Sequence, residues 1–183
     1  MEHVILVDEH DREIGTEEKL EAHRSGKLHR AFSIFLFNEK QEMLIQQRAH
    51  SKYHSGGQWS NACCSHPRPG EDPLAAATRR LKDELGIQCG LQKAFHFIYK
   101  APLDHQLIEH EFDHVFVGHF DGEPELNPCE VNAWRWIAFT DLEKEMSLSP
   151  GQFTYWFKVI WRKVWTVYLS LPDQPNLVRS VEK

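Results

Sequence analysis

The sequence lacks the features that would place a protein in a membrane, outside the cell or on nucleic acid. No apolar run approaches the roughly 20 residues that a membrane-spanning helix needs. Residues 1–9 are acidic and lack the basic start and long apolar stretch of a secretory signal peptide. Acidic residues outnumber basic ones by 27 to 21, so the net charge is −6, and there is no basic stripe suited to nucleic acid. We therefore expect a cytoplasmic protein with no membrane or nucleic-acid partner.

Cysteine is also scarce, whereas histidine is abundant. The four cysteines are Cys63, Cys64, Cys89 and Cys129. Two of them are adjacent, which does not suit a disulfide framework, so we expect free thiols in a reducing compartment. The 12 histidines make a metal site worth seeking, because neutral imidazole is a common metal ligand.

The apolar pattern predicts one α/β domain without linkers or repeats. A length of 183 residues suits a core over 30–170, preceded by an N-terminal segment over 1–29 and followed by a loose polar tail over 171–183. Strands, the first of them at a sheet edge, are predicted over 4–7, 31–37, 43–46, 95–100, 111–120 and 134–137. Helices are predicted over 73–85, over 140–145 with a Thr140 cap, and from 149 onward, and a loop is predicted over 49–69. This mixture predicts helices that cover a mixed β-sheet.

The predicted helix over 73–85 carries its charges in a particular order. Its apolar face is predicted to consist of Leu74, Thr78, Leu81 and Leu85. Aligned on Gly86, the charges approach a Nudix box: Gly, five residues, Glu, seven residues, Arg-Glu, an apolar residue, any residue, Glu-Glu, any residue, Gly and an apolar residue. The positions that correspond are Ser65, Glu71, Arg79, Arg80, Leu81, Asp83, Glu84 and Gly86.

Three positions of this box depart from the consensus: Ser65 replaces its first glycine, and Arg80 and Asp83 replace two glutamates. Arg80 and Asp83 stand where the box has glutamates that hold divalent metal around a diphosphate. A guanidinium at Arg80 would contact phosphate oxygens directly instead. A solvated amphipathic helix produces similar charge runs, so the helix alone leaves both interpretations open.

Histidines and carboxylates supply a second candidate group. Glu109 and Glu111 are two positions apart in a predicted strand, so their side chains share one face, which Asp113 continues. Together with imidazoles they would form a site suited to Mn²⁺ or Mg²⁺, with Zn²⁺ as an alternative. The candidates come from separate segments and lack a local zinc-binding spacing: His23, His29, His66, Glu109 and Glu111.

A thiol and two aromatic residues complete the candidates. Cys64 lies two residues before His66, and either a buried apolar role or an acid–base role suits it. In an extended segment Cys63 would face the opposite side, toward the core. For Trp156, either packing in the core or presentation of the ring face to a cationic ligand suits the pattern. Tyr99, when buried, needs a polar partner for its phenol.

Several short motifs, in a fixed order, carry a resemblance to a known family. They are Gly15-Thr16-Glu17-Glu18-Lys19, Leu28-His29-Arg30-Ala31-Phe32-Ser33, Gln47-Arg48-Ala49-His50-Ser51-Lys52, Trp59-Ser60-Asn61, Cys64-Ser65-His66-Pro67, Phe97-Ile98-Tyr99-Lys100-Ala101, Glu109-His110-Glu111 and Trp156-Phe157-Lys158. With the modified Nudix helix, they make nearly the whole chain similar to type 1 isopentenyl-diphosphate isomerases. The resemblance implies a Nudix-like α/β/α sandwich with a mixed β-sheet flanked by helices.

The resemblance also implies an activity and a role for each site residue. The family interconverts isopentenyl and dimethylallyl diphosphate through a tertiary carbocation, in isoprenoid biosynthesis. The implied catalytic residues are Cys64, Glu111, Tyr99 and Trp156, and the implied diphosphate ligands are Lys19, Arg48, Lys52 and Arg80. Mn²⁺ or Zn²⁺ would bind to His23, His29, His66, Glu109 and Glu111, and Mg²⁺ brought by the substrate would bind near Glu84.

Two other functions compete with this one. A Nudix hydrolase of a nucleoside diphosphate derivative would use the same helix but has no need for Cys64. A non-enzymatic module that binds metal or diphosphate would tolerate replacement of Cys64. The sequence leaves open the physiological metal, the choice between monomer and homodimer, the favoured direction of reaction, and whether residues before Ala31 become ordered only on metal binding.

Overall fold

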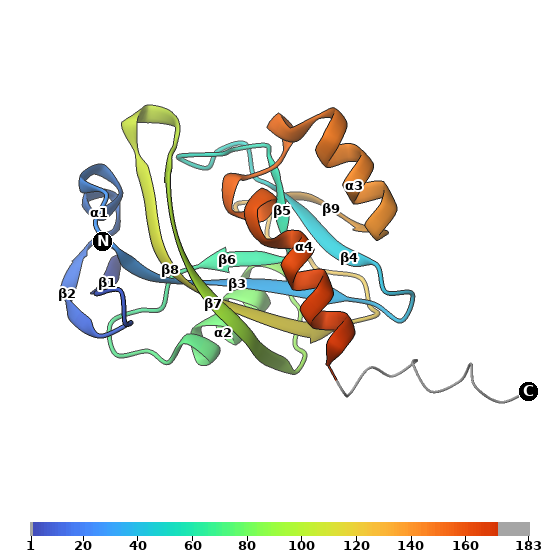
Figure 1. The fold of residues 1–183 in the computed structure, drawn as a ribbon, viewed down its shortest axis with the longest axis horizontal. Coiled ribbons are helices and arrows are strands. Elements are labelled where there is room, and N and C mark those ends of the chain that lie inside the picture. The colour runs from blue at the N-terminus through green and yellow to red at the C-terminus, as the bar shows by residue number, and fades with distance from the viewer. Residues whose placement is uncertain (1, 172–183) are drawn as a thin grey trace, which may run out of the picture.

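A mixed β-sheet runs through the part of the chain that this computed structural model describes, residues 2–171 (Figure 1). Helices lie on both of its faces, which confirms the predicted α/β class with a mixed, helix-flanked sheet. None of the helices in these residues is long and apolar enough to cross a membrane. The elements are β1 (His3–Val7), β2 (Glu13–Glu18), α1 (Lys19–Ser25), β3 (His29–Phe37), β4 (Met43–Arg48), β5 (Trp59–Asn61), β6 (Cys63–Ser65), α2 (Pro73–Leu85), β7 (Leu91–Pro102), β8 (Ile108–His119), β9 (Val131–Ile137), α3 (Phe139–Leu148) and α4 (Tyr155–Ser170), with 3₁₀ turns at Asp104–Gln106 and Pro150–Gln152.

Strand β3 is the centre of the sheet and determines which site residues become neighbours. It runs parallel to β8, with His29 opposite Glu111, and antiparallel to β6, with Ser33 opposite Cys64. Strand β8 forms a long antiparallel hairpin with β7, in which Tyr99 lies opposite Glu111. These registers bring residues from four separate stretches of sequence to one end of the sheet.

Helix α2 forms where the sequence predicts it because its two ends are well capped. The Asp72 carboxylate accepts hydrogen bonds from two backbone N–H groups of the first turn, and Pro73 occupies the first helical position. Gly86 ends the helix at φ 66°, and a β-carbon there would lie 2.8 Å from the Cβ of Glu125, so only glycine fits. Leu81 and Leu85 are buried as predicted.

Two members of the predicted apolar face of α2 are nevertheless on the surface. Leu74 is 41% exposed, and Thr78 bonds its hydroxyl back to the Leu74 carbonyl. The helix packs on the sheet through Ala76 and Ala77 in their place. Small side chains let the helix backbone approach the strands closely, and this turns Leu74 outward.

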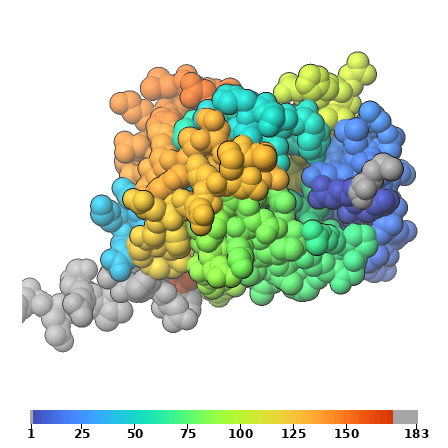
Figure 2. Space-filling model, turned by 180° about the vertical axis from the view of Figure 1, so that it is seen from behind, coloured from blue at the N-terminus to red at the C-terminus, as the bar shows by residue number. Residues whose placement is uncertain are grey.

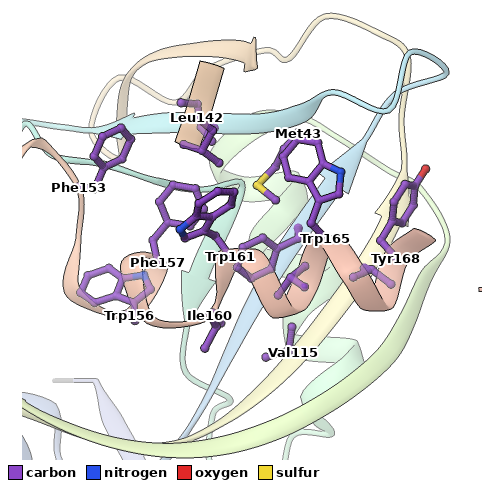
Figure 3. Packing of buried hydrophobic residues seen from close by; sticks show 14 of the residues in the cluster. Met43, Val115, Leu142, Phe153, Trp156, Phe157, Ile160, Trp161, Trp165 and Tyr168 are labelled. Carbon is purple, nitrogen blue, oxygen red and sulfur yellow. The ribbon is translucent and has the colours of Figure 1, made fainter. Parts of the chain in front are cut away.

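The opposite face of the sheet is covered by α4, which is the most aromatic element of the molecule. Trp161 and Trp165 lie between α4 and the sheet, and Tyr168 stacks on Phe37 with ring centroids 3.8 Å apart. Figure 3 shows this row of side chains running along the helix, with Trp156 at its first turn. The buried residues of α4 are Trp156, Phe157, Ile160, Trp161, Val164, Trp165 and Tyr168.

The helix begins later than predicted. Pro150–Gln152 forms a 3₁₀ turn, and Phe153 and Thr154 are extended, so α4 starts at Tyr155 rather than at 149. The Thr154 N–H donates to the Trp59 carbonyl, which ties the extended step to β5. This long-range bond outweighs the local helical pattern.

Three other sequence-based expectations differ from the structure. The segment predicted as a loop over 49–69 contains β5 and β6, whose three residues each are too few to show a period. The strand over 4–7, predicted at an edge, is interior because β2 pairs with its outer side. Thr140 lies inside α3, after the cap position Ala138, and makes no cap. Residues 172–183 of the predicted tail are outside the described part of the chain.

Candidate active site

A cavity opens at the end of the sheet where β3, β6, β7 and β8 meet. Its wall includes most of the residues singled out from sequence: Lys19, Arg48, Lys52, Cys64, His66, Arg80, Tyr99, Glu109, Glu111 and Trp156. The remaining three lie directly behind this wall. His23 and His29 are fully buried next to Glu109 and Glu111, and Glu84 is buried beside Arg80.

Four of the predicted metal ligands form one compact group. His23, His29, His66 and Glu111 are all buried, and each offers a ligand atom within 4.8 Å of the others. The Nδ1 atoms of His23 and His29 contact the backbone carbonyls of Lys19 and Lys27, at 2.7 and 2.9 Å. These contacts assign the N–H to Nδ1 and leave Nε2 as a free lone pair.

Buried atoms without partners show that this donor set fits a divalent cation. The Nε2 atoms of His23 and His29 and the Oε2 atom of Glu109 are buried and have no hydrogen-bond partner. Unpaired buried polar atoms are costly, and imidazole and carboxylate together suit a divalent transition metal. A cation among His23, His29, His66 and Glu111 would give both imidazole nitrogens a partner.

Glu109 belongs to a second group that includes a residue missed in the sequence. Its Oε2 atom lies 3.3 Å from His23 Nε2, and its Oε1 atom lies 3.4 Å from His54 Nε2. His54, His23 and Glu109 also have ligand atoms within 4.8 Å of one another. Burial lowers the pKa of His54 to about 2, so its imidazole is neutral, as ligation requires. The sequence around His54 gives no signal for this group, because its partners His23 and Glu109 lie far from it in the chain.

The Cys64 thiol lies on the cavity wall among four polar neighbours, of which Ser60 Oγ is the most distant at 3.9 Å. Its Sγ atom is 2.9 Å from Asn61 Oδ1, 3.0 Å from Trp156 Nε1 and 3.8 Å from Ser33 Oγ. Burial raises the pKa of Cys64 to about 12, so the group is a thiol at neutral pH. Cys63 faces the opposite side and packs in the core under α2, as the alternation of a strand predicts.

Glu111 connects the metal group to a phenol. The Tyr99 hydroxyl donates to Glu111 Oε2 over 2.7 Å, and His66 Nε2 lies 2.8 Å from Oε1. Burial favours the neutral acid, but the neighbouring imidazoles of His29 and His66 outweigh it and hold the pKa of Glu111 well below its usual value. Glu111 is therefore a carboxylate with a proton-bearing phenol in direct contact.

Basic side chains from separate elements make the other wall suitable for an anion. Lys19 begins α1, Arg48 ends β4, Lys52 follows in the next segment, and Arg80 lies on α2. Figure 2 shows the blue N-terminal segment, the cyan segment after β4 and the green α2 side by side on one face. Glu130, which the sequence did not single out, pairs with both Lys52 and Arg80.

The comparisons with known proteins first identify the fold class of this protein. A family model described as the NUDIX domain matches residues 27–157. A solved structure from Deinococcus radiodurans superposes with a TM-score of 0.73 and 20% identity, over 88% of this chain and 98% of that one. A MutT protein from Methanosarcina mazei gives a TM-score of 0.63 and 17% identity, over 79% and 96% of the two chains. The fold is that of the NUDIX domain.

Proteins with similar sequences identify one family within this fold class. The chain is 52% identical over 153 residues to isopentenyl-diphosphate Delta-isomerase 2 of Aromatoleum aromaticum, covering 84% of this chain and 81% of the relative. It is 46% identical over 170 residues to isopentenyl-diphosphate Delta-isomerase of Pectobacterium atrosepticum, covering 91% and 95%. The chain belongs to the isopentenyl-diphosphate Delta-isomerase family.

Proposed function

We propose that this protein interconverts isopentenyl diphosphate and dimethylallyl diphosphate, and that the cavity described above is its active site. The observation that carries the proposal is the pairing, in one cavity, of a neutral thiol at Cys64 with the Tyr99–Glu111 pair. Migration of a double bond needs one group that gives a proton to the alkene and another that takes a proton from the neighbouring carbon. Thiol and carboxylate can divide these tasks.

The proton balance of the proposed reaction closes within these residues. Cys64 gives its proton to the terminal alkene carbon, which leaves a tertiary carbocation. Glu111 accepts a hydrogen bond from Tyr99. It receives the proton that leaves the carbon adjacent to the cationic carbon. The product is the isomer with an internal double bond, and a proton must pass from Glu111 back to Cys64 before the next turnover.

Trp156 is proposed to stabilise the carbocation without trapping it. An aromatic face attracts a desolvated cation by about 2 kcal/mol or more and offers no nucleophile. The Arg48 guanidinium lies 5.4 Å from the centre of the same ring. Its positive charge would oppose the carbocation unless a bound anion neutralised it, so we expect chemistry to follow diphosphate binding.

The diphosphate is proposed to anchor a short hydrocarbon that offers few contacts of its own. Lys19, Arg48, Lys52 and Arg80 would hold its oxygens, so that binding energy distant from the alkene positions the reacting carbons. Mg²⁺ would accompany the diphosphate near Glu84, which is buried and bonded to Arg80 over 2.6 Å.

A second divalent ion, Mn²⁺ or Zn²⁺, is proposed to be held by His23, His29, His66, Glu109 and Glu111. When bound, such an ion supplies fixed positive charge beside the carboxylates. The residues themselves orient Glu111: His29 and His66 lie at its Oε1 atom, and Tyr99 bonds its Oε2 atom. We also propose that the chain folds as one domain and acts in the cytoplasm, as a monomer or homodimer.

The test is an NMR assay with isopentenyl diphosphate, Mg²⁺ and D₂O, with the Cys64→Ala variant as control. We expect dimethylallyl diphosphate with incorporated deuterium from the natural protein and none from the variant. Release of inorganic phosphate or a monophosphate would support the hydrolase alternative. That alternative is disfavoured by Arg80, which points a guanidinium at Glu84 where the box of the hydrolases has a glutamate.

A further inference from the structure

A buried polar cluster lies behind Cys64 and has no part in the scheme above. Ser60, Asn61 and Thr154 have no exposed surface. Their side chains contact one another and the indole N–H of Trp156: Ser60 Oγ lies 2.9 Å from Thr154 Oγ1, 3.1 Å from Asn61 Oδ1 and 3.0 Å from Trp156 Nε1. Polar groups are seldom buried so completely in an otherwise aromatic layer unless their directions matter.

The contacts of Asn61 determine which way its amide points. Its Nδ2 atom donates to two backbone carbonyls, that of Ile34 over 3.0 Å and that of Cys63 over 2.9 Å. The amide nitrogen has two N–H groups, and both are used. The reverse orientation would place Oδ1 against these two carbonyl oxygens, with no hydrogen between them. The Oδ1 atom must therefore face Cys64.

An amide oxygen can only accept, so the 2.9 Å contact between Asn61 Oδ1 and Cys64 Sγ needs the thiol hydrogen. The single N–H of Trp156 lies 3.0 Å from this sulfur and 3.0 Å from Ser60 Oγ, so its hydrogen is shared between the two acceptors. The sulfur thus has one neighbour that takes its hydrogen and one that gives it a hydrogen bond. The Ser33 and Ser60 hydroxyls lie farther from the sulfur, at 3.8 and 3.9 Å, so the 2.9 Å contact with Asn61 determines where the thiol hydrogen points.

We propose that Asn61 is a positioning residue for Cys64: its side-chain oxygen holds the S–H group and fixes the rotamer that brings the sulfur to the cavity. During the reaction the proton leaves sulfur for the alkene carbon, and the sulfur keeps the hydrogen bond from Trp156. The proton that returns is held again by Asn61. This inference rests on the proposed catalytic role of Cys64.

The experiment compares Asn61→Leu with Thr154→Val as a matched control. Leucine is close to asparagine in size and removes the acceptor. Valine at 154 also removes a buried hydrogen bond from the cluster, but Thr154 Oγ1 bonds Ser60 and not Cys64. The readouts are the infrared S–H stretching band of Cys64, identified by its absence in Cys64→Ala, with kcat, KM and the melting temperature.

We expect the S–H band of the natural protein at the lowered frequency of a hydrogen-bonded thiol, and a higher frequency in Asn61→Leu. We expect kcat to fall about tenfold in Asn61→Leu with KM unchanged, the factor that one directed hydrogen bond supplies. Thr154→Val should keep the low band and nearly all of kcat. An unbonded-thiol frequency in the natural protein would overturn the proposal without any variant.

Two other results would also overturn it. One is an unchanged band in Asn61→Leu, and the other is a loss of kcat in both variants in proportion to their loss of melting temperature. Should Asn61→Leu fail to fold, the natural protein alone still decides, because a thiol that gives its hydrogen to Asn61 must absorb at the lowered frequency. Failure of the proposed function can be distinguished from failure of this inference. If Cys64 were not catalytic, Cys64→Ala would stay active, whereas the infrared band would still report whether Asn61 accepts the thiol hydrogen.

Discussion

At the scale of single residues, the site combines a protonated group, the Cys64 thiol, with a charged group, the Glu111 carboxylate. Cys64 keeps its proton because it is buried, and Glu111 loses its own because imidazoles surround it. Tyr99 has contact only with the second of these, over 2.7 Å. Sequence reasoning identified all three by resemblance. It missed His54, whose partners His23 and Glu109 lie far from it in the chain, so that no local signature marks the group.

Replacing Tyr99 tests the phenol directly. Tyr99→Phe removes the hydrogen bond to Glu111 and keeps the stacked ring, so we expect kcat to fall by about tenfold to a hundredfold with little change in KM. Steady-state kinetics measure this. Tyr155→Phe is the control, because Tyr155 stacks next to Tyr99 but is 41% exposed. Equal losses in both variants would show that the Tyr99 hydroxyl has no particular role.

The position of His54 beside Glu109 predicts that its removal weakens metal binding. Its Nε2 atom faces Glu109 over 3.4 Å, so His54→Ala removes either a ligand or the support of one. We expect Mn²⁺ to bind about tenfold more weakly, the range found when outer partners of metal ligands are removed. Isothermal titration calorimetry on the metal-free protein measures the difference. His50→Ala, an exposed histidine in the same segment, should bind as tightly as the natural chain.

The buried thiol also links stability to pH. The pKa of Cys64 is about 12 in the folded protein against an ordinary value near 9, so the unfolded chain releases this proton first as pH rises. The folded state then binds more protons than the unfolded state, and stability falls between pH 9 and 12. Denaturant titrations across this window should show a shallower fall for Cys64→Ala. Parallel curves for the two proteins would contradict the assigned shift.

At the scale of elements, the capped helix is the part that the sequence predicted best. Asp72→Ala removes the N-cap of α2, and we expect the free energy of unfolding to drop by about 0.5–2 kcal/mol. Urea titration measures it. Asp141→Ala, in the first turn of α3, where no side chain makes the cap, should change stability less. A larger effect at Asp141 would mean that helix charge, rather than capping, dominates.

Elements without a local signature were predicted poorly for a physical reason. Helix α2 has Asp72, Pro73 and Gly86 at its ends, and all of this information lies within the helix itself. Strands β5 and β6 exist only because β4 and β3 pair with them. The start of α4 depends on a bond from Thr154 to Trp59. Residue patterns describe local preference, and these elements depend on partners that the pattern does not contain.

At the scale of the whole molecule, the N-terminal segment and the core share one sheet and one metal group. Strand β1 pairs with β3, and His23 from α1 faces Glu109 of β8. Without a cation, the Nε2 atoms of His23 and His29 remain unpaired in the interior. The cation should therefore stabilise the attachment of this segment to the rest of the molecule.

Metal removal tests this attachment. We expect chelation to lower the melting temperature and to speed proteolytic cleavage before Ala31, and added Mn²⁺ to reverse both, because binding to the folded state alone stabilises it. Limited proteolysis followed by mass spectrometry locates the cuts. Cleavage at the same rate with and without Mn²⁺ would mean that the segment holds its place without the ion.

The parallel pairing of β3 with β8 also has a consequence for how the protein reaches its active form. His29 and Glu111 become neighbours only when two strands that lie far apart in the chain, His29–Phe37 and Ile108–His119, have met in register. Closing such a long loop is slow compared with forming a helix. During refolding, the helical signal of α2 and α4 should therefore return before any catalytic competence, which appears only with the last long-range contacts.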